Sequence, residues 1–571
     1  MNKALLSDDQ IREFITNGFL ILNCENQENL HKIIKDKLEY FHNTESWLGN
    51  NVMARIPELW SITGSDIVKG AVASILGPEY VLHPHRAVHT SEPINDKKIT
   101  CSAHQDAPQM GIGSQAGSAW HQDAHSPLAR ARHHFPKYLI GFYFPHYTPP
   151  EMGPTRIYAG SQFYSKPLVP SKKFSLLGFE SGSFVLAHFD IVHAAFPNQT
   201  DQTRFMIKFV FARTKQQVAP TWNHIDENWN TPKNLCSQYN LESAWKASWF
   251  WLQGKETSSK YLGSVKNLNS ADQCLRVNAI YRAAHKSNIA RLTRKIEKLA
   301  EKNFHKRKLA KNEKGRNIPM DLQDGWERRW NERAVLFDDS AYTLGTIGIE
   351  AVPELINHLS HSDPWVVLNM IFALGEIGAE AEAAKPELVN LLNSSEQVVV
   401  RQTLDTLSSI GGNLDLAIKP IEKIFSSKNE KWCDPLVLRG WNAQEQIEVN
   451  SAFLLLSAVD GRTNQSALEN LLKKVLSCSN GYASNIATEA LRTFVSFGAI
   501  ILTNAPKEPN SLELLSKRLG PIHETLFERI HNVSVNGHVY NVAHTSKELP
   551  PHNDFASYKS QLSIQALHML Q

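Results

Sequence analysis

Two histidines and one aspartate in the first half of the chain have the residue types of a metal site. His121 and Asp123 form a His-x-Asp pair, and His193 follows further along the chain. Two imidazoles and one carboxylate on one face of a metal leave positions open for a co-substrate and oxygen, as in non-haem Fe(II) sites. On a strand, both residues of the pair would point to the same face, because side chains alternate with a period of two.

The His-x-Asp pattern alone is a weak signal, because it recurs at 104–106, 188–190, 224–226 and 552–554. Most such triplets are expected to be ordinary surface or hydrogen-bonded histidines. His104 with Asp106 remains an alternative to the pair at 121, and His188 remains an alternative to His193. His193 is favoured because it lies eleven residues before Arg204.

Short strands and turns surround these residues. Aromatic and β-branched residues at 138–144 predict a buried strand, and further strands are predicted at 156–158, 182–187 and 204–211. Glycine and proline residues between them mark turns. Short strands with few helix signals are typical of a double-stranded β-helix, or jelly roll, which is the fold predicted for this part of the chain.

An ordered set of motifs in this region resembles the phytanoyl-CoA dioxygenase family of Fe(II)/2-oxoglutarate-dependent oxygenases. The matching motifs are Trp120-His121-Gln122-Asp123, Gly153-Pro154-Thr155, Gly160-Ser161-Gln162, Phe189-Asp190-x-x-His193, Pro197-Asn198 and Arg204. A chain opening of helix, glycine and strand is also similar to that family. The resemblance implies a jelly-roll oxygenase domain with flanking helices.

The resemblance also implies a ligand set. His121, Asp123 and His193 would bind Fe(II), and Arg204 would bind the distal carboxylate of 2-oxoglutarate, with O2 as the second co-substrate. A guanidinium suits that task because it is planar, always charged and grips a carboxylate with two donors.

Two further residues are expected at the co-substrate or substrate. Thr155 and Gln162 would help to orient one of them, and no catalytic residue is predicted beyond the metal site. In relatives that halogenate, a small residue replaces the ligand carboxylate. Asp123 is present here, which favours hydroxylation or a related oxidation of an unactivated C–H bond.

Several helices and one histidine-rich strand are expected around the barrel. The strand predicted at 81–88 carries histidines expected to line the substrate site or support it, and the polar stretch 90–120 is either an active-site lid or a surface insertion. Trp245 and Trp249 recur at helical spacing and should face a core. Helices are predicted at 7–17, 30–41, 66–76 and 241–252.

Composition excludes several classes of protein. The chain of 571 residues has 60 basic and 57 acidic residues, so it carries no overall charge footprint for nucleic acid. Six cysteines lie far apart without a Cys-x-x-Cys pair, which favours reduced thiols in a cytoplasmic protein. No stretch approaches the ~20 apolar residues of a membrane span.

The charge changes after the oxygenase region. Residues 286–316 hold twelve Lys or Arg and three Glu, and the apolar spacing at 289–299 predicts an amphipathic helix. A basic helix of this kind either binds an anionic surface or is a solvated helix between domains, and the second is the commoner case.

A repeat follows this basic segment. The Leu-Gly-x-x-Gly pattern at 344–348 recurs at 374–378 and, with serine for the first glycine, at 407–411. Each copy precedes a helix in which Pro353, Pro386 or Pro420 is expected in the first turn; these prolines are 33 and 34 residues apart. This pattern resembles HEAT repeats.

Three parts are therefore predicted: an oxygenase domain at 1–270, a basic helical linker at 271–330 and an all-α HEAT-like solenoid at 331–571. Solenoids often bind proteins on their concave face. Three hypotheses follow: an oxygenase of small-molecule metabolites, which is favoured; an oxygenase of a protein substrate recruited by the HEAT repeats; and a catalytically silent HEAT adaptor.

Overall fold

The computed structural model describes most of the chain up to Phe494. The described residues are 4–24, 28–45, 49–93, 122–123, 131–164, 178–233, 235–237, 239–257, 263–302, 307–311, 317–323, 326–329, 337–432, 443–459 and 462–494. All of them belong to one compact unit, residues 1–494. His121, His104, Asp106 and most of the stretch 90–120 lie outside the described residues.

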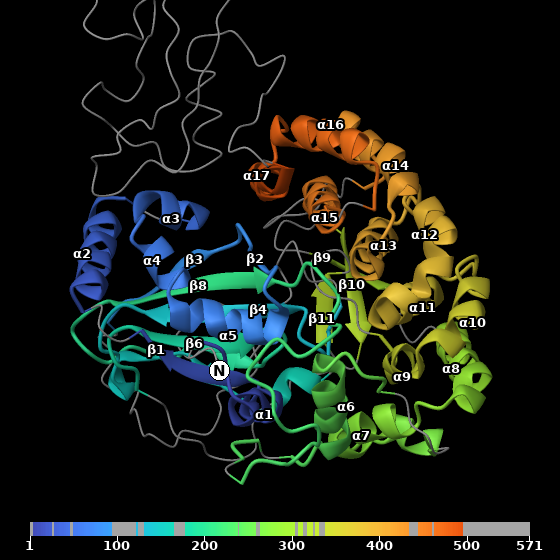
Figure 1. Cartoon of the computed structure of the whole chain (residues 1–571), viewed down its shortest axis with the longest axis horizontal. Helices are drawn as coiled ribbons and strands as arrows, with labels where there is room; N and C mark the ends of the chain where they lie inside the picture. The colour runs from blue at the N-terminus through green and yellow to red at the C-terminus, as the bar shows by residue number, and fades with distance from the viewer. Residues whose placement is uncertain are drawn as a thin grey trace, which may run out of the picture. The chain divides into compact units, whose positions relative to one another are not determined.

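The region predicted to be an oxygenase domain is built around a six-stranded antiparallel sheet (Figure 1). The strand order is β1-β6-β4-β8-β2, and β3 also pairs with β8. The strands are β1 (Phe19–Asn23), β2 (Val81–Leu82), β3 (Ala87–Ser91), β4 (Tyr138–Phe144), β6 (Ser183–His188) and β8 (Arg204–Ala212). A separate ladder pairs β5 (Arg156–Ile157) with β7 (His193–Ala194).

The register of the strands separates two faces of the main sheet. Phe142 lies opposite both Val185 and Lys208, and Arg204 shares the face of Lys208 because the two are four residues apart on β8. We call this the site face. An apolar cluster that includes Phe142, Val185 and Met206 covers much of it.

N-terminal helices cover the opposite face. Phe14 of α1 (Asp8–Asn17) stacks on His188, and His31 of α2 (Glu28–Thr44) lies 2.7 Å from the Tyr143 hydroxyl. The helix predicted at 7–17 is confirmed, and Ser7 forms a capping box with Gln10 at its start. The remaining helices before β2 are α3 (Val52–Arg55), α4 (Leu59–Thr63) and α5 (Asp66–Leu76).

The predicted strands are confirmed, and the histidine-rich one is divided into β2 and β3. Among the described residues the second sheet consists of β5 and β7 alone, so the complete jelly roll stays a prediction. Gln122 and Asp123 lie in an irregular segment instead of the strand predicted for the His-x-Asp pair.

The tryptophan-rich helix packs as predicted. In α6 (Glu242–Leu252), Trp245, Trp249 and Leu252 are fully buried. Trp251, which lies off that stripe, stacks on Phe135 with ring centroids 5.0 Å apart.

The segment predicted as a helical linker differs from that prediction in its second half. It begins with α7 (Gln273–Arg282) and the predicted amphipathic helix α8 (Ile289–Glu301), and it continues as a three-stranded sheet. The strands are β9 (Arg307–Lys311), β10 (Asn317–Gln323) and β11 (Trp326–Arg329). Both helices pack on the solenoid, since Arg276 pairs with Asp339 at 2.7 Å and Lys295 pairs with Asp338 at 2.6 Å.

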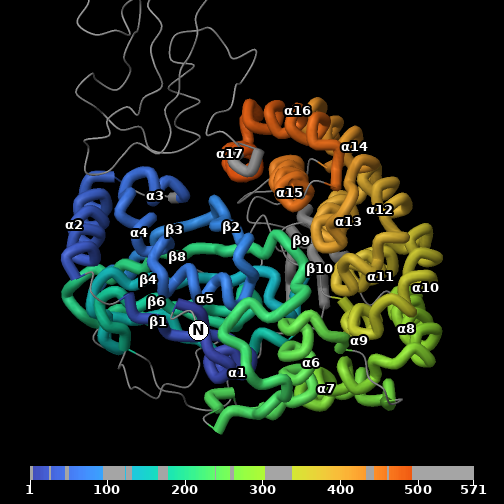
Figure 2. The backbone as a smooth tube through the Cα atoms, in the orientation of Figure 1, coloured from blue at the N-terminus to red at the C-terminus, as the bar shows by residue number. Residues whose placement is uncertain are grey.

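The solenoid consists of two layers of helices, which the tube in Figure 2 shows as an arc beside the sheet. The inner helices are α9 (Asp339–Ile347), α11 (Pro364–Ile377), α13 (Gln397–Ile410), α15 (Ala443–Ser457) and α17 (Gly481–Phe494). Outside them lie α8, α10 (Val352–Asn357), α12 (Lys385–Leu391), α14 (Asp415–Ser426) and α16 (Gln465–Leu476).

The Leu-Gly-x-x-Gly repeats are explained by packing between the inner helices. A Cβ atom on Gly375 of α11 would lie 2.7 Å from Thr406 of α13, so a larger residue would push the two helices apart. The last glycine of each copy follows its helix at a positive φ: 86° at Gly348, 74° at Gly378 and 63° at Gly411.

One detail of the repeat is wrong in the prediction. Pro420 is not in the first turn of its helix, because α14 already begins at Asp415. Inside a helix, a proline removes the donor for the carbonyl four residues earlier, and here that carbonyl belongs to Leu416, an exposed residue.

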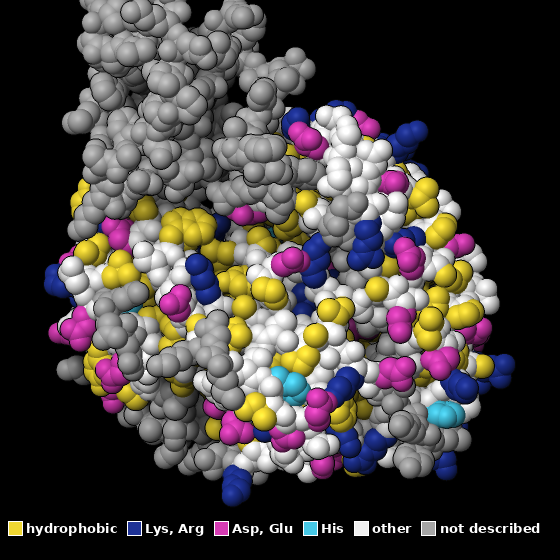
Figure 3. All heavy atoms as spheres, in the orientation of Figure 1, with side chains coloured by type: hydrophobic (Ala, Val, Ile, Leu, Met, Phe, Trp, Pro, Cys, Tyr) yellow, Lys and Arg dark blue, Asp and Glu magenta, His cyan; other side chains and the backbone are white. Residues whose placement is uncertain are grey.

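Charge and hydropathy of the described part fit the composition. On the face shown in Figure 3, basic and acidic side chains are interspersed. None of the described helices combines the length and apolar character needed to cross a bilayer.

Candidate functional site

His193 is held in the orientation of a metal ligand. The pairing of β7 with β5 fixes its backbone, and its ring lies 5.4 Å from that of Phe142 on the site face. Its Nδ1 atom lies 3.0 Å from the carbonyl of Ile191, where it donates a hydrogen bond. This bond selects the tautomer in which Nε2 carries a lone pair, as second-shell partners of metal-binding histidines do.

Asp123 lies beside that lone pair. Its Oδ1 is 3.9 Å from Nε2 of His193, and its side chain is 17% exposed. The structure therefore brings together two of the three predicted iron ligands. The third, His121, lies outside the described residues, and within the described part no three His, Cys, Asp or Glu side chains form a metal-binding group.

Lys208 is a site residue that sequence reasoning did not single out. Its ammonium donates to Oδ2 of Asp123 from the site face of β8. The sequence could have indicated it, because side chains alternate between the two faces of β8 and Lys208 therefore lies on the same face as Arg204.

A buried arginine holds the backbone next to the Asp123 carboxylate. Nη1 of Arg132 donates to the Asp123 carbonyl at 2.5 Å and to Oδ1 of Asp190 at 2.8 Å. Asp190 also accepts the His133 backbone amide at 3.0 Å. The short segment that carries Asp123 is thus tied to Arg132 and, through it, to the end of β6.

Arg204 presents a buried cation with free donors. Its side chain is 3% exposed, and Nε and Nη1 have no hydrogen-bond partner among the described residues. Burial lowers its pKa to about 10, so the guanidinium remains charged at neutral pH. Because an unsatisfied buried cation is costly, this arrangement favours an anionic ligand.

Histidines of β3 and of the turn before it lie near the charged side chains of Lys208, Arg204 and Asp123. Loss of solvation, with the cations Lys208 and Arg204, lowers the pKa of His89 to about 3. His89 lies opposite Met206 of β8 on the site face. Burial and Lys208 likewise lower the pKa of His85 to about 4, against the opposing effect of Asp123.

The remaining predicted residues have other visible contacts. Gln162 donates to the Ile15 carbonyl at 2.9 Å and fixes the end of α1. Thr155 is half-buried immediately before β5, which pairs with the strand of His193. Roles for both in binding the co-substrate stay predictions.

The alternative ligand His188 is placed elsewhere. It lies on the face opposite Val185 and stacks on Phe14 of α1, away from the site face. Its Nδ1 accepts the backbone amide of Asp190 at 3.1 Å. These contacts favour His193 over His188.

The described donors fit an iron ion with a dicarboxylate co-substrate. His193 directs a lone pair toward Asp123, and the Asp123 carboxylate pairs with the ammonium of Lys208. On the same face, Nε and Nη1 of Arg204 have no hydrogen-bond partner among the described residues. Imidazole and carboxylate are the ligand types that such iron sites use.

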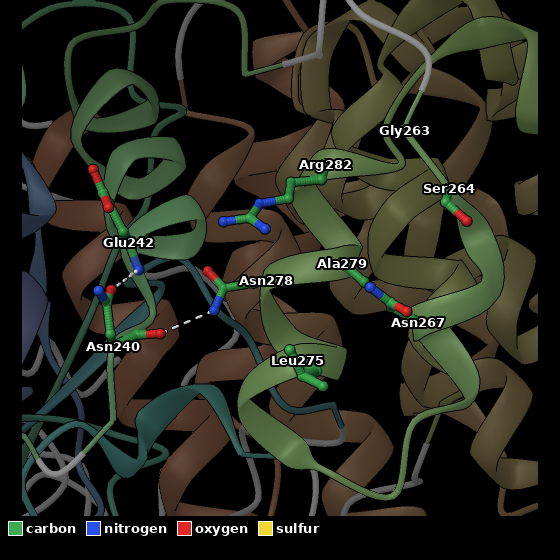
Figure 4. A pocket seen from close by; sticks show the side chains of 9 residues that line it. All are labelled: Asn240, Glu242, Gly263, Ser264, Asn267, Leu275, Asn278, Ala279 and Arg282. Atoms are coloured by element: carbon green, nitrogen blue, oxygen red, sulfur yellow. Dashed lines mark hydrogen bonds between the residues drawn. The ribbon is translucent and has the colours of Figure 1, made fainter.

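A separate cavity of about 310 Å³ lies beside α6 and α7 (Figure 4). Its amides are used within the fold: Asn278 donates to the Asn240 carbonyl at 2.9 Å and accepts the Ser243 amide at 3.0 Å. None of the predicted site residues lines it.

Comparison with protein families decides what this region is. The phytanoyl-CoA dioxygenase (PhyH) family matches residues 65–206, which extend from α5 to the start of β8 and include Asp123 and His193. The chain carries a phytanoyl-CoA dioxygenase domain. The HEAT repeat family matches residues 341–433 of the same chain, so the oxygenase domain is followed by HEAT repeats. A comparison with curated proteins found no match.

Solved structures similar to part of this chain share little sequence with it. The carbocyclase SnoK from nogalamycin biosynthesis is 15% identical over 37% of this chain and 85% of its own, with a TM-score of 0.28. EctD from S. alaskensis, solved with 2-oxoglutarate and 5-hydroxyectoine, is 12% identical over 41% of this chain and 86% of its own, with a TM-score of 0.29. CytC3, solved with Fe(II) and alpha-ketoglutarate, is 13% identical over 37% of this chain and 78% of its own, with a TM-score of 0.27. Likeness of this degree does not establish a shared activity.

Proposed function

We propose that the protein is an Fe(II)- and 2-oxoglutarate-dependent dioxygenase that hydroxylates, or otherwise oxidises, an unactivated C–H bond of a small-molecule metabolite. The family of its oxygenase domain supports an oxygenase. Iron held by His121, Asp123 and His193 would supply the oxygen-activating chemistry when bound. The net reaction converts 2-oxoglutarate and O2 to succinate and CO2 and adds one oxygen atom to the substrate.

The observation that carries this proposal is the free guanidinium of Arg204. It is buried on the site face, and two of its donor nitrogens have no partner among the described residues. A planar pair of donors matches the distal carboxylate of 2-oxoglutarate, and burial strengthens the charge-assisted hydrogen bonds. Arg204 would therefore hold one end of the co-substrate while its other end faces the metal ligands.

The surrounding residues position groups and exclude water. The Ile191 carbonyl and the Phe142 ring hold His193, and Arg132 holds the backbone at Asp123. The apolar side chains of the site face, Met206 among them, leave little room for bulk water. In relatives that halogenate, a small residue replaces the ligand carboxylate, so the presence of Asp123 supports hydroxylation.

The contacts of the solenoid favour a small-molecule substrate over a protein substrate. All five inner helices contact the oxygenase domain, so the concave surface on which a solenoid usually binds a protein is occupied within this chain. This weighs against a protein substrate recruited by the concave face.

The test is succinate release coupled to substrate oxidation. Protein supplied with Fe(II), 2-oxoglutarate and O2 is expected to release succinate, and the low-molecular-mass fraction of a cell extract should stimulate release and yield a product heavier by one oxygen atom. Arg204→Gln should lose this activity at ordinary 2-oxoglutarate concentrations. Arg282→Gln, on α7, is the matched control.

Two outcomes would count against the proposal. Succinate release by the wild type no greater than by Arg204→Gln would remove the assignment of the co-substrate site. Stimulation by the macromolecular fraction alone would replace the small-molecule substrate with a protein.

A further inference from the structure

The concave surface of the solenoid is used by the chain's own oxygenase domain. Each inner helix contributes a contact, and together the contacts run from the segment after Asp123 to the turn before β3. The contacts are Tyr342 of α9 with Arg132, Glu376 of α11 with His133, Asp405 of α13 with Lys137, Phe453 of α15 with the site-face cluster, and Tyr482 of α17 with His85.

The strongest of these contacts form a buried group of opposite charges. Nδ1 of His133 lies 2.7 Å from Oε1 of Glu376, and its Nε2 lies 3.6 Å from Oδ2 of Asp405. Asp405 also binds the ammonium of Lys137 at 2.8 Å and the hydroxyl of Tyr138 at 3.0 Å. These side chains are 12% exposed or less, so little water screens their charges.

This charged group adjoins the support of a metal ligand. Arg132, the neighbour of His133, donates to the Asp123 carbonyl, and its own carbonyl accepts the Tyr342 hydroxyl at 2.8 Å. The His133 amide and the Arg132 guanidinium share the carboxylate of Asp190. A shift of His133 toward or away from the solenoid would therefore move the groups that hold Asp123.

We propose that the solenoid is an internal support of the metal site, in which Glu376 of α11 and Asp405 of α13 position the ligand Asp123 through His133 and Arg132. This inference rests on the proposed function, because it takes Asp123 as a metal ligand. Glu376 and Asp405 are positioning residues, and neither contacts the metal ligands directly. The HEAT repeats are then needed for metal binding itself, in addition to any role toward other proteins.

The test measures metal affinity on folded protein. Co(II) is titrated anaerobically into the full chain with 2-oxoglutarate present, and binding is followed by the visible absorption of the ion. Glu376→Gln removes one charge but keeps the size of the side chain, and Asp405→Asn does the same on α13. Both should weaken Co(II) binding by about 3- to 30-fold, with the far-ultraviolet spectrum unchanged.

Matched variants separate positioning from general damage. Glu387→Gln lies on the exposed side of the outer helix α12 and should bind Co(II) as the wild type does. Tyr342→Phe removes the hydrogen bond to the Arg132 carbonyl and should weaken binding in the same direction, so it decides the matter if Asp405→Asn fails to fold.

Failure of the support role and failure of the proposed function give different results. Equal affinities in the wild type, Glu376→Gln and Tyr342→Phe would overturn the support role and leave the proposed function intact. Failure of the wild type to bind Co(II) with 2-oxoglutarate would overturn both.

Discussion

Nε2 of His193 lies 3.9 Å from Oδ1 of Asp123, while Oδ2 of the same carboxylate accepts a hydrogen bond from the ammonium of Lys208. The two residues come from segments 70 positions apart in the sequence. Lys208 thus places a positive charge at the carboxylate where the proposed Fe(II) would bind. This relationship makes metal binding an exchange of one cation for another.

Replacing Lys208 with methionine should strengthen metal binding. The wild-type carboxylate must give up an ion pair when the metal binds, and the lysine also repels a dication. Lys208→Met removes both costs, so the dissociation constant for Co(II) or Fe(II) should fall by about threefold to tenfold. Anaerobic metal titration measures this. Weaker binding by Lys208→Met than by Lys69→Met, an exposed control on α5, would show that Lys208 orients Asp123 instead of competing for it.

The contact between oxygenase and solenoid should depend on pH. Loss of solvation and Lys137 would lower the pKa of His133, but Glu376 and Asp405 outweigh them and raise it to about 9. A raised pKa stabilises the fold fully below the ordinary value near 6.5, and that stability is lost as the pH rises through about 9. The loss amounts to as much as roughly 3 kcal/mol.

The measurement is the midpoint of thermal unfolding between about pH 6 and pH 10. Between about pH 6.5 and pH 9 the wild type should lose stability more steeply than His133→Gln, whose side chain does not titrate. Parallel curves for the two proteins would contradict a charged His133.

Gly141 should be intolerant of a side chain. It lies in the middle of β4, and a Cβ atom there would overlap the ring of Phe184 and lie 3.3 Å from that of Phe211. Gly141→Ala should therefore destabilise the protein by about 1–3 kcal/mol, seen as a lower urea midpoint. Gly481→Ala is the control, because nothing lies within 4 Å of a Cβ atom there. An unchanged midpoint for Gly141→Ala would mean that the two rings can move aside.

Local patterns predicted much of the fold. The helix at 7–17, the buried strand at 138–144 and the spacing of Trp245 and Trp249 each depend on neighbouring residues in the sequence, and the structure confirms them. The HEAT repeats were visible because their glycines recur with a fixed period. The position of Pro420 was wrong because its helix already begins at Asp415, a start that the proline alone did not indicate.

Local sequence patterns could not predict the long-range polar contacts. His133 and Glu376 are 243 positions apart, and no periodicity or motif links them. The pairing of Arg132 with Asp190 depends in the same way on tertiary structure. Gln162 shows the converse, since its place in a motif indicated a co-substrate role, whereas its visible hydrogen bond serves α1.

The central claim is that Asp123 helps to bind a metal to which 2-oxoglutarate also binds. Anaerobic titration of Fe(II) and 2-oxoglutarate into the wild type, Asp123→Ala and the exposed control Asp36→Ala tests it most directly. The account predicts a metal-to-keto-acid absorption band in the wild type and in Asp36→Ala, strongly weakened in Asp123→Ala. A band of equal strength in Asp123→Ala, or no band in folded wild-type protein, would contradict it.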